Sequence, residues 1–203
     1  EVVEGYEGYR DEPETVYAWA HAAYRNGEYP AVVDLLQTPQ AQAFGRDIPM
    51  LTRLYARVLL ESGDAVESVR AYRTYLAGDP EDRSVRIELI RALVSAEQFP
   101  AALQEIERLD TEGRSPAENN QLAYLRGLGL FHGERYTEAL AAFSAVRDNA
   151  YEPFLSYHTA WCLYRTGEVA EAGRTVAAVR DALPDSLYVD ASYLYAWSLY
   201  QTD

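Results

Sequence analysis

The stretch Ala160-Trp-Cys-Leu-Tyr-Arg-Thr-Gly167 and its near copy Ala196-Trp-Ser-Leu-Tyr-Gln-Thr-Asp203 decide the fold of this chain. In the first copy Ala160, Leu163 and Tyr164 share one face at helical spacing, so both stretches predict the end of an amphipathic helix. The same order of an apolar helix and a short Gly or acidic turn returns at 22–29, 58–65, 92–99 and 129–136. The interval of about 34 to 37 residues indicates an array of repeated units.

Each unit predicts two antiparallel helices. In the last complete unit Val169, Ala172 and Val176 form a second apolar face after the turn. Pro80 and Pro184 end second helices, and the stretch 115–118 reads as a capping box with proline at the first helical position. Almost no stretch alternates like a strand. Helices are predicted at 13–26, 30–37, 48–62, 65–77, 81–96, 99–110, 116–132, 136–147, 151–166, 169–182 and 186–202.

Small residues recur where the two helices of a unit cross. They are Ala20, Ala56, Gly127, Ala160 and Ala196 in first helices, and Ala102, Ala139 and Ala172 in second helices, with Val32 and Ser68 in the other two. Facing small side chains allow helix axes to approach to about 8 Å. The pattern therefore predicts closely packed helix pairs.

This arrangement resembles the tetratricopeptide repeat family over about residues 13–203. The shared features are the turn glycines, the aromatic residue after the turn and the pair of small residues; the glycines are Gly27, Gly63, Gly133 and Gly167, and the aromatic residues are Tyr29, Phe99 and Tyr136. The chain departs from the family pattern at Ile90, Ala65 and Val169, and residues 40–47 read as an insertion in the first unit.

The resemblance implies an all-α fold, a right-handed superhelical solenoid of antiparallel helix pairs with about five and a half repeats. We expect residues 1–12 to be a lead-in and 13–203 a single domain. The expected units are 13–48, 49–82, 83–118, 119–152 and 153–188, with a half unit at 189–203. We also expect the chain to be a fragment of a longer protein, because the helical pattern is still running at its last residue.

The composition excludes some classes of function. Acidic residues number 32 against 18 basic residues, all of them arginine, and the net charge is −14. A chain this acidic repels nucleic acid and anionic membranes unless a local basic patch outweighs the total. The arginine-only composition is explained by either a GC-rich genome or a high-salt habitat.

In helix-pair solenoids the first helices line the concave face that binds partners. The inward positions of these helices are rich in aromatic and arginine residues, which are enriched at protein interfaces. The predicted partner-binding residues are Tyr17, His21, Arg25, Arg53, Arg57, Arg91, Tyr124, His132, Tyr157, Trp161, Arg165, Tyr193 and Trp197.

Two interpretations of these residues stay open at this point. The aromatic residues either contact a partner or wedge between adjacent repeats, and the wedge is favoured for Tyr24, Phe131 and Tyr164. Arg53 and Arg57 lie four apart on one helix face and repel each other unless an anion lies nearby. That anion is either the carboxylate of Glu61 or Glu88, or an acidic group of a bound partner.

Catalytic and metal sites find little support in the sequence. His158 and Cys162 lie four apart, but a metal site needs two further ligands of the right kind. Cys162 also holds a small-residue position of the repeat, which favours a buried packing thiol. Gly127 and Gly129 lie inside a predicted helix and form no phosphate loop. We therefore predict no enzyme activity, no metal and no cofactor.

The sequence thus predicts a non-catalytic module that binds a peptide or helical segment of another protein, for which an acidic segment is one option. The alternative is a scaffold that self-assembles through apolar end helices, motivated by the apolar last helix. No nucleic acid and no membrane insertion are expected. Residues 183–191 resemble the repeat joint of bacterial envelope lipoproteins and Tol-Pal accessory proteins. This resemblance implies the cell envelope, with the cytoplasm as the alternative.

Overall fold

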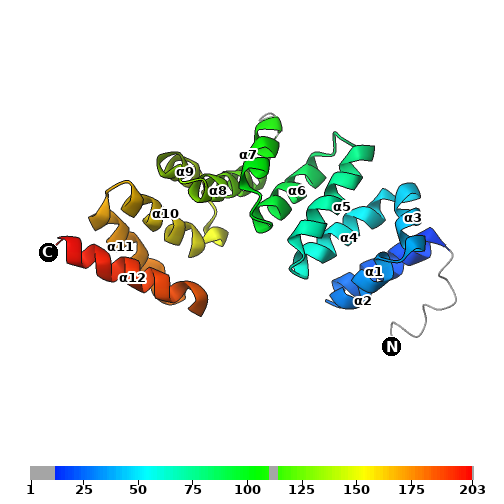
Figure 1. Cartoon of the computed structure of the whole chain (residues 1–203), viewed down its shortest axis with the longest axis horizontal. Coiled ribbons are helices and arrows are strands. Elements are labelled where there is room, and N and C mark those ends of the chain that lie inside the picture. Colours follow the sequence, from blue (N-terminus) through cyan, green and yellow to red (C-terminus); the bar gives the residue numbers. More distant parts are fainter. Residues whose placement is uncertain (1–11, 110–113, 203) are drawn as a thin grey trace. The chain divides into compact units, whose positions relative to one another are not determined.

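The computed structural model describes residues 12–109 and 114–202. These residues form α-helices and short 3-10 turns, with no strand in either range. By their contacts they fall into two compact units, divided between Gln98 and Phe99. We call them unit 1 and unit 2. The all-α class and the repeated helix pairs predicted from the sequence are confirmed (Figure 1).

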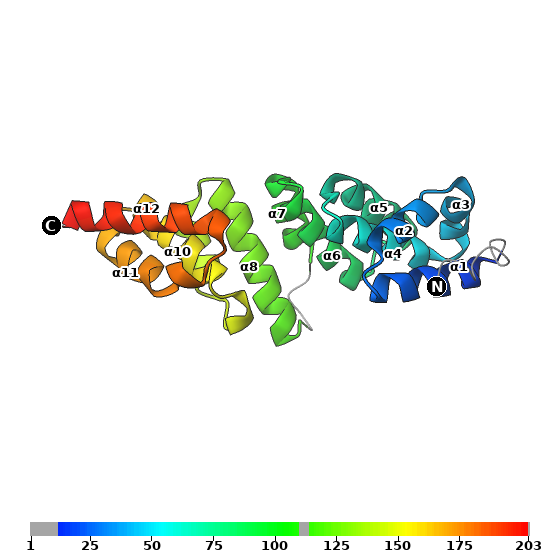
Figure 2. The same ribbon diagram turned by 90° about the horizontal axis from the view of Figure 1, so that it is seen from below.

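Unit 1 contains six helices among its described residues. They are α1 (Pro13–Arg25), α2 (Tyr29–Leu36), α3 (Pro39–Asp47), α4 (Pro49–Glu61), α5 (Ala65–Gly78) and α6 (Arg83–Ser95). Unit 2 contains α7 (Phe99–Arg108), α8 (Pro116–His132), α9 (Tyr136–Phe143), α10 (Phe154–Arg165), α11 (Val169–Val179) and α12 (Asp185–Thr202). Short 3-10 turns at Asn149–Tyr151 and Arg180–Ala182 precede α10 and α12. Figure 2 shows α11 beside α10 and α12, both of which it contacts.

Helix α3 is absent from the helices predicted above, where residues 40–47 read as an insertion. The structure shows a helix that begins at Pro39, with the Thr38 hydroxyl accepting from the Ala41 backbone N–H at 3.3 Å. Ala41 is buried and packs in the same core as α1, α2 and α4. The inserted residues thus form an extra helix that belongs to the first repeat.

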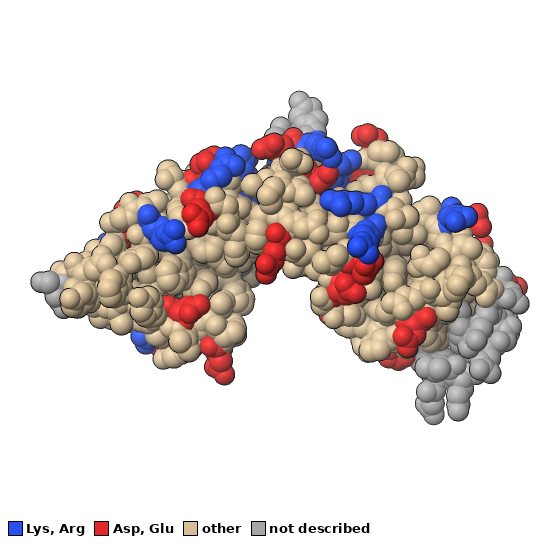
Figure 3. Space-filling model, in the orientation of Figure 1, with Lys and Arg blue, Asp and Glu red and all other residues tan. Residues whose placement is uncertain are grey.

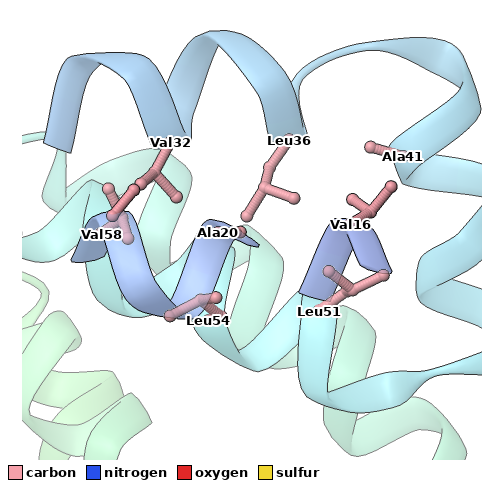
Figure 4. Packing of buried hydrophobic residues seen from close by; sticks show 9 residues of the cluster. Val16, Ala20, Val32, Leu36, Ala41, Leu51, Leu54 and Val58 are labelled. Atoms are coloured by element: carbon pink, nitrogen blue, oxygen red, sulfur yellow. The ribbon is translucent and has the colours of Figure 1, made fainter. Parts of the chain in front are cut away.

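The core of unit 1 joins side chains from four helices. Figure 4 shows Val32 and Leu36 of α2 pointing toward Ala20 of α1, with Leu54 of α4 below them. All four are buried. Burying a Val or Leu side chain contributes about 1.5–3 kcal/mol, so this cluster holds the first helix pair against the second.

Small residues set the closeness of the pairs, as predicted. In the second repeat Ser68 of α5 lies so close to α4 that its hydroxyl donates to the Ala56 carbonyl at 2.7 Å. In unit 2 a Cβ added to Gly127 would lie 2.2 Å from Cε1 of Phe143. Only a residue without a side chain fits between α8 and that ring.

The turns between paired helices share one left-handed residue. Gly27, Gly63 and Gly167 hold it with φ of 79°, 88° and 94°. Glu97 and Glu134 hold the same position in the other repeats, with φ of 57° and 58°. The glycine of the fourth repeat, Gly133, is displaced from this position by one residue, has a φ of −82° and caps α8.

Candidate functional site

The first helices of unit 1 bring three charged side chains together. Arg53 and Arg57 of α4 both donate to the carboxylate of Glu88 on α6. Arg53 binds with two nitrogens, Nη2 at 2.7 Å from Oε1 and Nε at 3.2 Å from Oε2. Of the two carboxylates of this chain that the sequence left open, Glu61 and Glu88, it is Glu88 that binds both arginines. We call Arg53, Arg57 and Glu88 the arginine cluster.

The arginine cluster is partly enclosed by the protein. The lower dielectric there strengthens the attraction between its opposite charges. Burial alone would raise the pKa of Glu88, but the hydrogen bonds from Arg53 and Arg57 outweigh it and leave that pKa lowered. The hydrogen bond to Glu88 raises the pKa of both arginines. All three groups are consequently charged at neutral pH. Arg57 keeps 41% of its side chain exposed against 16% for Arg53, so Arg57 is the one a partner can reach.

Three further residues border the arginine cluster. Tyr72 of α5 is buried, and burial together with the charge of Glu88 raises the pKa of its hydroxyl. Arg91 of α6 is exposed and acts electrostatically on the same hydroxyl. Asp82, at the start of α6, adds a second carboxylate near Arg53. Arg53 and Arg57 thus share the single carboxylate of Glu88, and Arg91 lies within electrostatic range of the adjoining Tyr72.

The other predicted residues of unit 1 lie on α1. Tyr17 and His21 stack with ring centroids 5.8 Å apart, and His21 is exposed. Arg25, in the last turn of α1, is exposed as well. Tyr24 is partly buried. It lies close enough to Arg57 for the two groups to interact electrostatically. In Figure 3 arginine and acidic side chains lie side by side over α5 and α6.

In unit 2 the predicted aromatic residues join a ring cluster rather than an open surface. Tyr124 packs against Tyr151 at 4.8 Å, and burial raises its pKa to about 12. His158 lies among Tyr124, Phe131 and Tyr157, and burial lowers its pKa to about 4. The wedge interpretation therefore describes this part of α8 and α10 better than a partner contact.

The remaining predicted residues of α8 and α10 differ in exposure. His132 is exposed at the end of α8 and stacks on Phe99 with centroids 4.2 Å apart. Arg165 is exposed and lies over the ring of Tyr136 at 4.6 Å. Tyr157 is buried in the core and Trp161 is partly buried against it. We therefore leave Tyr157 out of the candidate surface.

Tyr193 and Trp197 of α12 lie outside the core. They stack with centroids 6.2 Å apart, and Trp197 packs on Tyr200 at 5.7 Å. Tyr193 is 61% exposed and Tyr200 is 76% exposed. This aromatic row is an accessible apolar surface of unit 2.

Sequence reasoning missed the contribution of Tyr72, which is absent from the predicted partner-binding residues. Its position one turn after the small residue Ser68 gives no sign that it borders a charged cluster.

Cys162 is buried, as the packing interpretation predicts, and burial raises its pKa to about 12. Within residues 12–109 and 114–202, no three His, Cys, Asp or Glu side chains gather as metal ligands would. None of the described helices has the length and apolar content needed to cross a membrane.

Solved structures of low sequence identity share the fold. MamA of Desulfovibrio magneticus RS-1 is 16% identical with a TM-score of 0.69, over 84% of this chain and 94% of that one. YrrB, described as a TPR protein with an unusual peptide-binding site, is 17% identical with a TM-score of 0.66, over 95% and 97% of the two chains.

A curated relative agrees at the level of sequence. The tetratricopeptide repeat protein 30 homolog of Aedes aegypti is 24% identical over 134 residues, which is 66% of this chain. The chain spans only 20% of the length of that relative. Two family models described as tetratricopeptide repeat match residues 59–123 and 124–186, together more than half of the 203 residues. The chain therefore belongs to the tetratricopeptide repeat family.

Proposed function

We propose that this chain is a non-catalytic interaction module and that unit 1 binds an acidic segment of another protein across α1, α4 and α6. The observation that carries the proposal is the arginine cluster, in which one carboxylate is shared between two guanidinium groups. Each guanidinium offers five N–H donors, so Glu88 leaves donors of Arg57 available to a second carboxylate.

Charge supports an acidic partner. The chain as a whole carries a net charge of −14, whereas the two positive charges of Arg53 and Arg57 share the single carboxylate of Glu88. A positive patch on an acidic protein orients an approaching acidic segment and disfavours its binding elsewhere on the acidic surface. Tyr17, His21 and Arg25 on α1 supply the aromatic and planar groups that commonly anchor an interface.

The relatives are consistent with this role. YrrB is described as having a peptide-binding site, and its fold is similar to that of this chain. Family membership alone does not place that site, so the assignment to α1, α4 and α6 rests on the charges and exposures given above.

The proposal is tested with a fluorescein-labelled peptide of alternating Glu and Tyr, measured by fluorescence anisotropy at low salt. Binding is expected to weaken as salt rises, because exposed charges are screened. The variant Arg57→Glu with Arg91→Glu should reduce affinity at least about tenfold, since two favourable contacts become repulsive. A peptide of alternating Lys and Tyr is attracted to the acidic surface of the chain, and its binding should not weaken in this double variant.

The matched control is Arg70→Glu with Arg73→Glu on α5, which changes the net charge equally. Both arginines are exposed, and the side chain of Arg70 forms an ion pair with its neighbour Glu67. This variant should bind the acidic peptide within about twofold of the parent chain, allowing for long-range charge effects. Equal losses in the two double variants would show that net charge, rather than this surface, governs binding.

A further inference from the structure

A surface groove of about 560 Å³ lies in unit 2, where α7 and α9 both pack on α8. Much of its lining is apolar and includes Ile106 of α7, Leu122 and Leu130 of α8, and Ala142 of α9. We call the space lined by these residues the α8 groove. A space of this size with a mainly apolar lining and a few polar groups is typical of a ligand site.

The same position of the second repeat holds a smaller space of about 250 Å³. Arg70 of α5 lines that space and forms an ion pair with Glu67. The counterpart of Arg70 in the α8 groove is Ala141, whereas Gln104 and Arg174 hold this position in the third and fifth repeats. Alanine in place of these long polar side chains widens the groove of the fourth repeat.

The charged residues that line the α8 groove are Arg114, Arg126 and Glu138. The carboxylate of Glu138 is already bound by Arg135, whose Nε lies 2.7 Å from Oε1. The guanidinium of Arg114 donates to the Leu109 carbonyl at 2.8 Å, which fixes its direction, and Arg126 is exposed. A guanidinium pairs well with a carboxylate, so the groove is suited to an acidic ligand with an apolar part.

The length of the α8 groove favours an extended peptide. Its lining residues on α8 run from Asn119 to Leu130. At roughly 1.5 Å per residue, this stretch of helix is about 16 Å long, and an extended segment of about five residues covers the same length. Side chains of such a segment alternate between two sides. One side can therefore face the apolar lining while the other carries the acidic groups.

We propose that the α8 groove binds an extended peptide segment in which acidic residues alternate with small or branched apolar residues. The apolar side chains pack on Leu122, Ala123 and Ala142, and the carboxylates pair with Arg114 and Arg126. The site uses residues of unit 2 alone, so it does not depend on the function proposed for the arginine cluster. It selects its peptide by the size of the apolar side chains as well as by charge.

The probe is a peptide of alternating Glu and Val, titrated into the full chain and followed by NMR of isotopically labelled alanine methyl groups. The signals of Ala123, Ala141, Ala142 and Ala145, which line the groove, should shift saturably. The signal of Ala178, at the position of Ala145 in the next repeat, should stay unchanged. Peptides of alternating Gln and Val, or of alternating Glu and Ser, should bind at least about fivefold more weakly, because each lacks either the charge or the apolar side.

A pair of double variants tests the shape of the groove. Ala141→Gln with Ala145→Gln places longer side chains at two exposed positions and leaves the net charge unchanged. It should weaken binding about fivefold or more, because the new side chains occupy the groove. The control is Ala170→Gln with Ala178→Gln at exposed positions on α11, which should bind within about twofold of the parent chain.

A pair of single variants tests the charge. Arg126→Gln should weaken binding about threefold or more, because one ion pair with the peptide is lost. Arg174→Gln on α11 changes the net charge equally at an exposed position and should bind like the parent chain. Equal effects of Arg126→Gln and Arg174→Gln, or of the two alanine double variants, would overturn the proposal. Equal binding of the Gln and Val peptide, or shifts confined to alanines of unit 1, would overturn it as well.

Discussion

Arg53 of α4 and Glu88 of α6 form a two-point ion pair that links the second repeat to the third, with the shorter contact at 2.7 Å. Both side chains are largely enclosed, at 16% and 13% exposure. A pair in this position contributes more than an exposed pair, because removing one partner strands the other away from water.

Replacing the carboxylate should therefore destabilise unit 1. Glu88→Gln is expected to lower the free energy of unfolding by about 1–3 kcal/mol, measured by urea denaturation at pH 7. The same variant should bind the acidic peptide more tightly, because both arginines lose their internal partner. Glu67→Gln, which breaks the exposed pair with Arg70, should change stability by less than about 0.5 kcal/mol. Unchanged stability in Glu88→Gln would contradict the structural role of the pair.

Gly127 should resist a substitution that usually stabilises helices. Gly→Ala in a helix interior gains about 1 kcal/mol, but here the new Cβ would lie 2.2 Å from the Phe143 ring. We expect Gly127→Ala to lose about 1–2 kcal/mol through overpacking, with recovery when Phe143→Leu is added. Gly78→Ala, where nothing lies within 4 Å, should cause no loss. A gain in stability for Gly127→Ala would show that α8 and α9 are not so closely packed.

At the left-handed turn position of the fourth repeat, a substitution to glycine should stabilise the chain. Glu134 has a φ of 58°, a left-handed conformation that glycine adopts at no steric cost. Glu134→Gly should raise the midpoint temperature of thermal unfolding. The expected gain in the free energy of unfolding is about 0.5–1 kcal/mol. Gly167→Glu, at the same position of the next repeat, should lose about as much. The assignment of these two positions as equivalent fails if both variants shift the midpoint in the same direction.

His158 should make stability depend on pH between neutrality and about pH 4. Its folded pKa is lowered from 6.5 to about 4 by burial, so the unfolded chain binds its proton first as pH falls. Stability contributed by neutral His158 is complete above pH 6.5 and is lost as pH falls toward 4. From pH 7 to pH 5 the loss is about 2 kcal/mol.

This prediction is checked by urea unfolding of the parent chain and His158→Phe at both pH values. The variant keeps a ring in the aromatic cluster and should lose the dependence of about 2 kcal/mol between pH 7 and pH 5. His21→Gln removes an exposed histidine and should retain the parent pH dependence. If His158→Phe behaves like the parent chain, another group governs the acid response.

The repeat register could be read from the sequence because small residues and turn glycines are local signals. Ala56 and Ser68 were expected to face each other, and the Ser68 hydroxyl contacts the Ala56 carbonyl. Helix α3 was missed although Thr38 and Pro39 carry the same cap-and-proline signal that identified Ser115 and Pro116. The repeat length favoured an insertion there, and that expectation outweighed the local signal.

The candidate site was less predictable because it depends on neighbours distant in sequence. The arginine pair indicated an anion, but only packing of α6 on α4 distinguishes Glu88 from Glu61. Tyr157 and Tyr193 occupy the same repeat position, yet one is buried and the other is 61% exposed. Which of them is accessible is decided by the next helix, and the local sequence contains no such information.

The most direct test of the proposed function is to map the acidic peptide by NMR on the isotopically labelled full chain. We expect shifts at the side-chain Nε–Hε groups of Arg57 and Arg91 and at backbone amides of α1, α4 and α6, and all of them should fade as salt is added. Shifts confined to α2, α3 and α5, or to unit 2, would contradict it.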